Sequence, residues 1–348
     1  MTKASVSFWG ISCVLCLLLG AAGRAQGVEK LFVDETGYKV SLNVPVKRAV
    51  VFNTYNAEFF RAVGGKDVLV GLDRGTFALE KYWPGLSNSI VVGQGQQEPN
   101  WEKVVSARPD VVVMPRNGAY EMARQKLGPF GIPVIVMTGW DVTKHYENVL
   151  LVGELTGRES RALALNAFHK KYDRIVDERV RGLPTRSIYL EKGAKFFTSL
   201  VGSGWHDMIV QAGGRNIFDQ INFASQAKSK GNVHEFEIDA EAVIRANPYA
   251  IIKQIDTSYL PPGKEKMAAA IAEIKARPGW DSLDAVKSDR IYVVTYFGAG
   301  AVSKLVGKLY IAKFLHPALF ANIDPAAVMK EWLTEYQGVE YLGPYASQ

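Results

Sequence analysis

The chain has 348 residues, which is enough for two domains of ordinary size. Apolar residues make up 48% of it and charged residues 22%, a composition that excludes a disordered protein and favours a folded one with a large core. The net charge of +6 is spread along the chain without a Lys/Arg run, which argues against nucleic acid as a partner.

Residues 1–25 are predicted to be a cleavable signal peptide. Lys3 precedes a short apolar run, and Gly23 and Ala25 occupy the small-residue positions of a cleavage site before Gln26. The alternative is an N-terminal membrane anchor, but the apolar run is short for a bilayer. We therefore expect a protein secreted through a cleavable signal peptide into the periplasm.

Both cysteines, Cys13 and Cys16, lie within this predicted signal peptide. The residues before each of them fit a lipid-attachment site poorly, so we expect a soluble exported protein. The mature chain would then have no disulfide, no thiolate metal site and no cysteine nucleophile. Its net charge would fall to +4, because Lys3 and Arg24 leave with the peptide.

The first half of the mature chain alternates between strand and helix patterns. Residues 28–43 alternate around the turn "DETG" and predict a β-hairpin. Continuous apolar runs predict buried strands at 48–53, 67–73, 110–114 and 133–138. Amphipathic stretches predict helices at 55–65, 100–108, 121–131 and 143–157. This order is typical of a parallel sheet covered on both faces by helices.

A long helix is predicted from Glu159 to Arg181, where neither Gly nor Pro interrupts the helical spacing of apolar residues. The alternation then resumes, with strands predicted at 186–191, 249–255 and 289–295, and helices at 204–214, 239–248, 264–276, 303–315 and 324–338. The fold class is therefore α/β, with two Rossmann-like lobes and parallel-rich sheets joined by one connector helix. The expected division is 26–157 for the first lobe, 158–182 for the connector and 183–348 for the second lobe.

One short pattern occurs in both halves. "NWEKVVSARP" begins at Asn100 and "DAEAVIRANP" at Asp239, and each places Glu two residues after a helix-capping residue. The two glutamates are Glu102 and Glu241. The repeat suggests two lobes related by pseudo-symmetry.

Several longer segments carry a resemblance to a known family. They are 33–52 ("VDETGYKVSLNVPVKRAVVF"), 99–114, 198–218 ("TSLVGSGWHDMIVQAGGRNIF"), 237–252, 280–294 and 312–324. Together they resemble the periplasmic substrate-binding proteins of ABC importers for ferric siderophores, vitamin B12 and related metal chelates. The resemblance implies two α/β lobes joined by one long helix, and a permease and ATPase complex in the inner membrane as partner. We expect a monomer without an intrinsic cofactor.

The resemblance also implies a role for the repeated glutamates. In that family one Glu on each lobe docks onto Arg residues of the permease, and Glu102 and Glu241 are the matching positions. The alternative is local, because a Glu in the first helical turn interacts favourably with the helix dipole. Both roles are compatible.

A ligand is expected in a cleft between the lobes, where the loops after the strands meet. These loops carry aromatic residues and several cations, the latter being Arg74, Arg116, Lys192, Lys195 and Lys253. Such a set suits a large, partly flat, anionic ligand such as a ferric siderophore. The predicted ligand-binding residues are Tyr55, Arg74, Arg116, Trp140, Lys195, Trp205 and Tyr296.

The sequence also leaves other ligands open. Corrinoid and haem are further chelates, and the loop before Trp205 leads into a helix N-terminus that could hold a molybdate-type oxyanion. A free or His-chelated metal ion would use His206 and His234. The sequence lacks G-x-S-x-G, H-E-x-x-H and P-loop motifs, so we expect no enzymatic activity.

Overall fold

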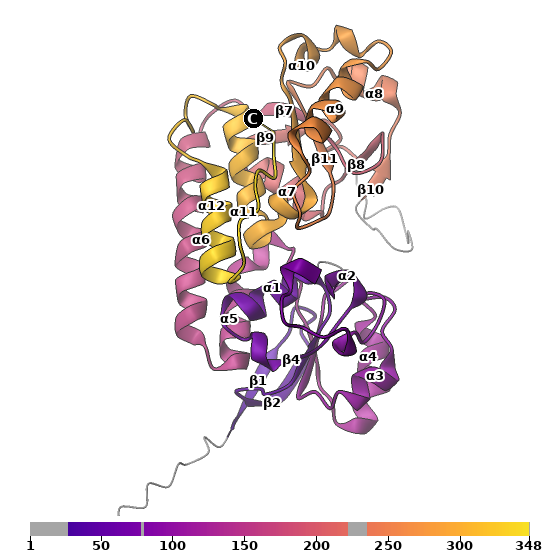
Figure 1. Ribbon diagram of the computed structural model, residues 1–348, viewed down its shortest axis with the longest axis vertical. Coiled ribbons are helices and arrows are strands. Elements are labelled where there is room, and N and C mark those ends of the chain that lie inside the picture. The colour runs from indigo at the N-terminus through magenta and orange to yellow at the C-terminus, as the bar shows by residue number, and fades with distance from the viewer. Residues whose placement is uncertain (1–26, 78–79, 222–234, 348) are drawn as a thin grey trace, which may run out of the picture.

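The computed structural model describes residues 27–77, 80–221 and 235–347 (Figure 1). The predicted signal peptide, with Cys13 and Cys16, lies outside the described residues, and so does His234. Within the described ranges, no helix combines the length and apolar character needed to cross a membrane.

The first lobe is built on a four-stranded parallel sheet with the order β4-β3-β5-β6. Its strands are β3 (Ala49–Val51), β4 (Leu69–Leu72), β5 (Val111–Met114) and β6 (Val134–Val136). The helices around it are α1 (Thr54–Ala62), α2 (Arg74–Phe77), α3 (Trp101–Ser106), α4 (Tyr120–Leu127) and α5 (His145–Thr156). The hairpin β1 (Val28–Val33) and β2 (Lys39–Val44) is antiparallel, as predicted, and extends below this lobe in Figure 1.

Both faces of this sheet are covered, because successive strand residues belong to different cores. Val51 packs in a cluster with Phe60 of α1 and Val152 of α5. Val50 packs in another cluster, with Val104 of α3 and Leu127 of α4. Burial on both faces explains why the strands are continuous apolar runs in the sequence.

The second lobe repeats this plan with the order β12-β11-β7-β9. Its parallel strands are β7 (Arg186–Glu191), β9 (Gly214–Asn216), β11 (Ala250–Ile255) and β12 (Ile291–Thr295). Its helices are α7 (Gly204–Gln211), α8 (Ala240–Ala246), α9 (Lys264–Lys275), α10 (Asp284–Lys287) and α11 (Tyr296–Leu315). A small antiparallel pair, β8 (Phe197–Ser199) and β10 (Glu235–Glu237), was not predicted.

The connector α6 spans Glu159–Val180 and runs along one side of both lobes, as Figure 1 shows. Helix α12 (Pro325–Glu331) lies beside α6, and a π-helical turn at Trp332–Tyr336 extends it. The main core cluster contains Phe59 of the first lobe, Leu165 of α6 and Leu309 of α11. One hydrophobic cluster therefore extends through both lobes and the connector.

The prediction for helix 303–315 was wrong at its start. Within α11, Ala301 is extended and Val302, Ser303 and Lys304 have φ values of 49°, 50° and 76°. Three successive non-glycine residues in the left-handed region are costly and persist only where surrounding contacts hold them. One such contact is the Ser303 hydroxyl, which donates to the Gly139 carbonyl at 2.6 Å.

Candidate functional site

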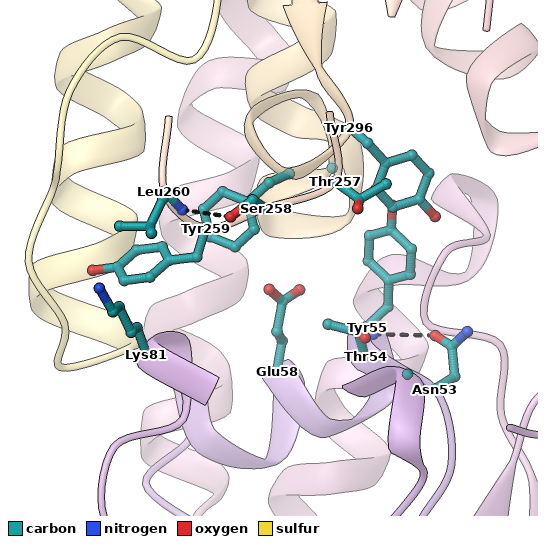
Figure 2. A pocket seen from close by; sticks show the side chains of 13 residues that line it. Asn53, Thr54, Tyr55, Glu58, Lys81, Thr257, Ser258, Tyr259, Leu260 and Tyr296 are labelled. Carbon is teal, nitrogen blue, oxygen red and sulfur yellow. Dashed lines mark hydrogen bonds between the residues drawn. The ribbon is translucent and has the colours of Figure 1, made fainter. Parts of the chain in front are cut away.

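The candidate site is a cavity of about 480 Å³ between the two lobes (Figure 2). Such a volume falls within the usual range of small-molecule sites, about 300–1,000 Å³. The first lobe contributes Asn53, Thr54, Tyr55, Glu58, Gly75 and Lys81, and the second lobe contributes Thr257, Ser258, Tyr259, Leu260, Tyr296, Phe297 and Gly300.

On the first lobe, the loop after β3 and the start of α1 form the cavity wall. The Asn53 side chain caps α1 by accepting from the Tyr55 backbone at 3.1 Å. The Asn53 backbone donates to the buried Asp73 carboxylate at 2.5 Å, and the other Asp73 oxygen accepts from the Thr76 backbone at 2.7 Å. Asp73 thus fixes the loops that follow two neighbouring strands.

On the second lobe, the loops after β11 and β12 form the opposite wall. The Thr295 hydroxyl caps the following turn by accepting from Gly298 at 2.9 Å. The Tyr296 backbone donates to the carbonyl of Asp256 at 2.9 Å, and the Asp256 carboxylate accepts from Ser258 at 2.8 Å. These bonds hold Tyr296 and Ser258 at the cavity.

The lobes touch at Tyr55. Its hydroxyl accepts a hydrogen bond from the ammonium group of Lys304 at 2.9 Å. A Cβ on Gly300 would lie 2.7 Å from the same hydroxyl, so only glycine allows this approach. Lys304 is 3% exposed, and burial lowers its pKa to about 7, with the charge of Lys192 acting in the same direction and that of Glu58 opposing it.

Glu58 is an acid at the floor of the cavity. It lies one turn into α1, is 5% exposed, and Figure 2 shows its carboxylate pointing into the space between Tyr55 and Tyr259. One carboxylate oxygen accepts from the Tyr82 hydroxyl at 2.7 Å. Burial raises the pKa of Glu58 to about 7, although the Tyr82 hydrogen bond and the charges of Arg61 and Lys304 lower it.

This shift makes stability depend on pH. Since the folded protein disfavours the ionised acid, stability should fall as pH rises from 4.5, the unfolded value, through 7. We expect Glu58→Gln to raise the free energy of unfolding at pH 8 by roughly 2–3 kcal/mol, and to have little effect at pH 4. Urea unfolding of both proteins at the two pH values measures this. A Gln variant that is less stable at pH 8 would contradict it.

Three of the predicted ligand-binding residues are brought together. The rings of Tyr55 and Tyr296 are 6.4 Å apart, and those of Trp205 and Tyr296 are 5.9 Å apart. Tyr55 and Tyr296 line the cavity, whereas Trp205 is 4% exposed and is not part of its lining. The Lys304 ammonium faces all three rings.

The other four predicted ligand-binding residues do not line this cavity. Arg116 forms an ion pair with Asp141, and its guanidinium lies 4.6 Å from the Trp140 ring centroid. Arg74 donates to Asn88 at 3.0 Å beside a separate surface hollow. Lys195 pairs with Glu273 at 2.8 Å. Their part in binding a ligand stays a prediction.

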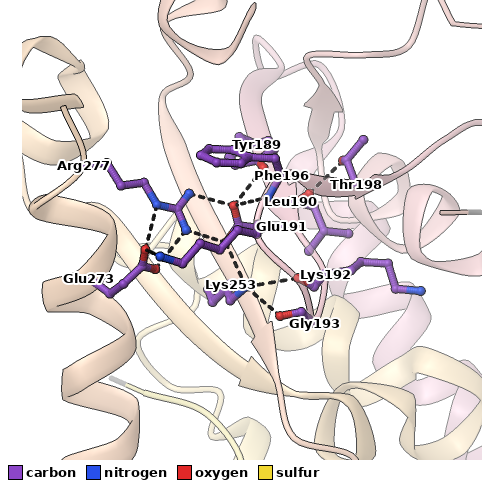
Figure 3. Close-up of polar contacts among 11 residues, drawn as sticks. Tyr189, Leu190, Glu191, Lys192, Gly193, Phe196, Thr198, Lys253, Glu273 and Arg277 are labelled. Atoms are coloured by element: carbon purple, nitrogen blue, oxygen red, sulfur yellow. Dashed lines mark hydrogen bonds and ion pairs between the residues drawn. The ribbon is translucent and has the colours of Figure 1, made fainter. Parts of the chain in front are cut away.

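Lys253, expected among the loop cations, lies instead in β11 and is buried. It pairs with Glu191 at 2.8 Å, and Arg277 forms two bonds to the same carboxylate at 2.7 and 2.8 Å (Figure 3). Burial opposes ionisation of Glu191, but these bonds keep its pKa below the usual value. Glu273 joins the cluster through Arg277, which lowers the pKa of Glu273 to about 2.

His206, the described member of the predicted histidine pair, is held by carboxylates. Its Nε2 lies 2.9 Å from Asp219 and its Nδ1 lies 3.4 Å from Asp207, and these contacts raise its pKa. Among the described residues, no group of three or more His, Cys, Asp or Glu side chains is placed to hold a metal ion.

The two repeated glutamates stand in equivalent local settings. Glu102 is exposed in the first turn of α3, after the Asn100 cap, which accepts from Lys103 at 3.0 Å as the pattern predicts. Glu241 is exposed in the first turn of α8, after the Asp239 cap. Its side chain is 79% exposed and pairs with Arg245 at 3.5 Å.

The structure has two α/β lobes with a cavity between them, and comparison with known proteins identifies the family. Residues 50–295 match the family described as periplasmic binding protein, and the chain belongs to that family. A similar curated protein is the uncharacterized ABC transporter substrate-binding lipoprotein YvrC of Bacillus subtilis, 24% identical over 75% of this chain and 76% of its own. The protein is thus a periplasmic binding protein.

Solved structures support the fold. The TroA-like periplasmic binding protein FepB of Veillonella parvula aligns with a TM-score of 0.72 and 23% identity, covering 91% of this chain and 99% of FepB. The molybdate-bound MolA of Haemophilus influenzae aligns with a TM-score of 0.68 and 17% identity, covering 90% and 99%. At these identities the likeness concerns the fold alone.

Proposed function

We propose that the protein captures a metal chelate, foremost a ferric siderophore, in the inter-lobe cavity and delivers it to a membrane permease. The cavity of about 480 Å³ with walls from both lobes is the observation that carries this proposal. Four aromatic residues of its lining, Tyr55, Tyr259, Tyr296 and Phe297, suit a bulky organic ligand. Corrinoid and haem are also bulky organic chelates, and they are the alternative ligands of this cavity.

A molybdate-type oxyanion at the start of α7 is less well supported, although MolA is titled as bound to molybdate. A Cβ on Gly204 would lie 2.5 Å from the Trp140 carbonyl and 2.6 Å from the Lys304 side chain. The first turn of α7 is therefore covered by protein atoms. A free metal ion is also less well supported, because within the described ranges no three His, Cys, Asp or Glu side chains are placed to hold one.

Delivery would use Glu102 and Glu241 as permease contacts, one on each lobe. Both are exposed first-turn residues of short helices, and neither lines the cavity. The protein would work as a periplasmic monomer after loss of residues 1–25, without an intrinsic cofactor and without catalysis.

Native mass spectrometry of the protein purified from its own periplasm, with an absorbance spectrum, tests the ligand class. We expect a retained or re-bindable coloured ferric chelate. Uptake of free divalent cations alone, with affinity lost in His206 and His234 variants, would contradict the chelate proposal.

A further inference from the structure

We propose that Glu58 determines ligand specificity, because its carboxylate at the floor of the cavity binds hydrogen-bond donors of the ligand and disfavours negative charge at that end. The matching groups are amide N–H, hydroxyl or ammonium. The inference rests on the proposed function, since it concerns the ligand of the same cavity.

Glu58 has an acceptor that faces the cavity. The Tyr82 hydroxyl bonds one carboxylate oxygen at 2.7 Å, and Figure 2 shows the carboxylate directed into the cavity. An ionised carboxylate only accepts hydrogen bonds and has room for several, so it has capacity left for a ligand donor.

No cation of the described residues forms an ion pair with Glu58. The nearby Arg61 guanidinium is used elsewhere: it donates to the Tyr82 carbonyl and to the Gln337 side chain. A carboxylate that is 5% exposed, with no cation at ion-pair distance and the charges of Arg61 and Lys304 acting on it only from farther away, is destabilising, so a hydrogen-bond donor on a ligand would stabilise it.

The other groups at the cavity are compatible with a ligand that donates a hydrogen bond to Glu58 at the floor. The Tyr259 hydroxyl donates to the Glu340 carbonyl, and the Lys304 ammonium bonds Tyr55 beneath the cavity surface. Lys81, the cation that lines the cavity, is exposed at its rim near Tyr259 in Figure 2. A chelate with negative groups would meet Lys81 at the rim and repulsion from Glu58 at the floor.

The chemistry separates two kinds of ferric chelate. A ferric trihydroxamate is net neutral and can carry amide or hydroxyl donors at its periphery, whereas a ferric tricatecholate is trianionic. Placing negative charge against an ionised, desolvated carboxylate is unfavourable, while a donor there forms a charge-assisted hydrogen bond. The neutral, donor-bearing chelate is the expected ligand.

Tryptophan-fluorescence titration at pH 8 with these two chelates tests the inference. We expect the protein to bind the trihydroxamate at least tenfold more tightly than the tricatecholate. Glu58→Gln keeps the shape of the side chain but removes its negative charge. It should weaken trihydroxamate binding at least tenfold and reduce the difference in affinity between the two chelates. Glu121→Gln, an exposed first-turn substitution on α4, should change neither affinity.

The outcomes distinguish the two proposals. Equal or tighter binding of the tricatecholate, or unchanged trihydroxamate affinity in a folded Glu58→Gln variant, would overturn the role of Glu58 and leave chelate capture standing. Failure of both chelates to bind would overturn the chelate proposal and the role of Glu58 with it. A melting temperature of Glu58→Gln at or above that of the parent shows that the variant is folded.

Discussion

Reversing the charge at both repeated glutamates should abolish uptake while leaving ligand affinity unchanged. In Glu102→Lys/Glu241→Lys each new ammonium would face a permease arginine, and like charges in an interface cost several kcal/mol. Either single reversal should give intermediate uptake, because one contact survives. Uptake of labelled chelate by cells of the native host, with affinity measured on the purified variants, checks this.

The local alternative predicts a different result. Loss of a favourable helix-dipole interaction costs about 1 kcal/mol or less at each site and would leave transport intact in the folded protein. Glu121→Lys/Glu265→Lys is a matched control, since both residues are exposed first-turn glutamates, one in each lobe. Normal uptake by the Glu102/Glu241 double variant would exclude the docking role.

Removing the Glu191 carboxylate should destabilise the second lobe strongly. Glu191→Ala leaves Lys253 and Arg277, 6% and 7% exposed, without their shared acid. Breaking a buried ion pair from one side costs about 3–5 kcal/mol. We expect the melting temperature of the mature protein to fall by about 10 °C.

Two variants separate the charge from the packing. Glu191→Gln keeps the volume and should still lose much of the stability, whereas adding Lys253→Met should recover part of it by removing the unpaired cation. Lys195→Ala breaks a pair whose lysine is 63% exposed, and it should cost less than about 1 kcal/mol. An unchanged melting temperature in Glu191→Ala would contradict the proposed contribution of the buried Glu191, Lys253 and Arg277 cluster to stability.

The layered fold could be predicted from the sequence because strands that are buried on both faces of a sheet have continuous apolar sequences. β5 is an apolar run and β11 begins with three apolar residues, and the capping residue Asn100 precedes α3. The pair β8 and β10 has three residues in each strand, too few for alternation to show.

The site could be predicted less completely than the fold, because the prediction assumed that the cations of the loops after the strands face the ligand. Lys253 is the fourth residue of a buried strand, and only the positions of Glu191 and Arg277 in space explain a cation there. Glu58 and Lys304 were missed because an acid inside an amphipathic helix and a lysine in "AVSKLV" both look solvent-facing in sequence. Both are held by tertiary contacts, Glu58 with Tyr82 and Lys304 with Tyr55, which no local pattern encodes.

The contact of the C-terminal segment with the first lobe has a consequence for the order in which the chain folds. Gln337 accepts from Arg61 and donates to the Glu58 carbonyl at 3.1 Å, across 276 and 279 residues of sequence. This polar partner of α1 is thus absent until almost all of the polypeptide has been synthesised. Contacts between such distant residues form late and slow folding. The floor of the cavity is therefore completed by one of the last segments of the chain to be synthesised.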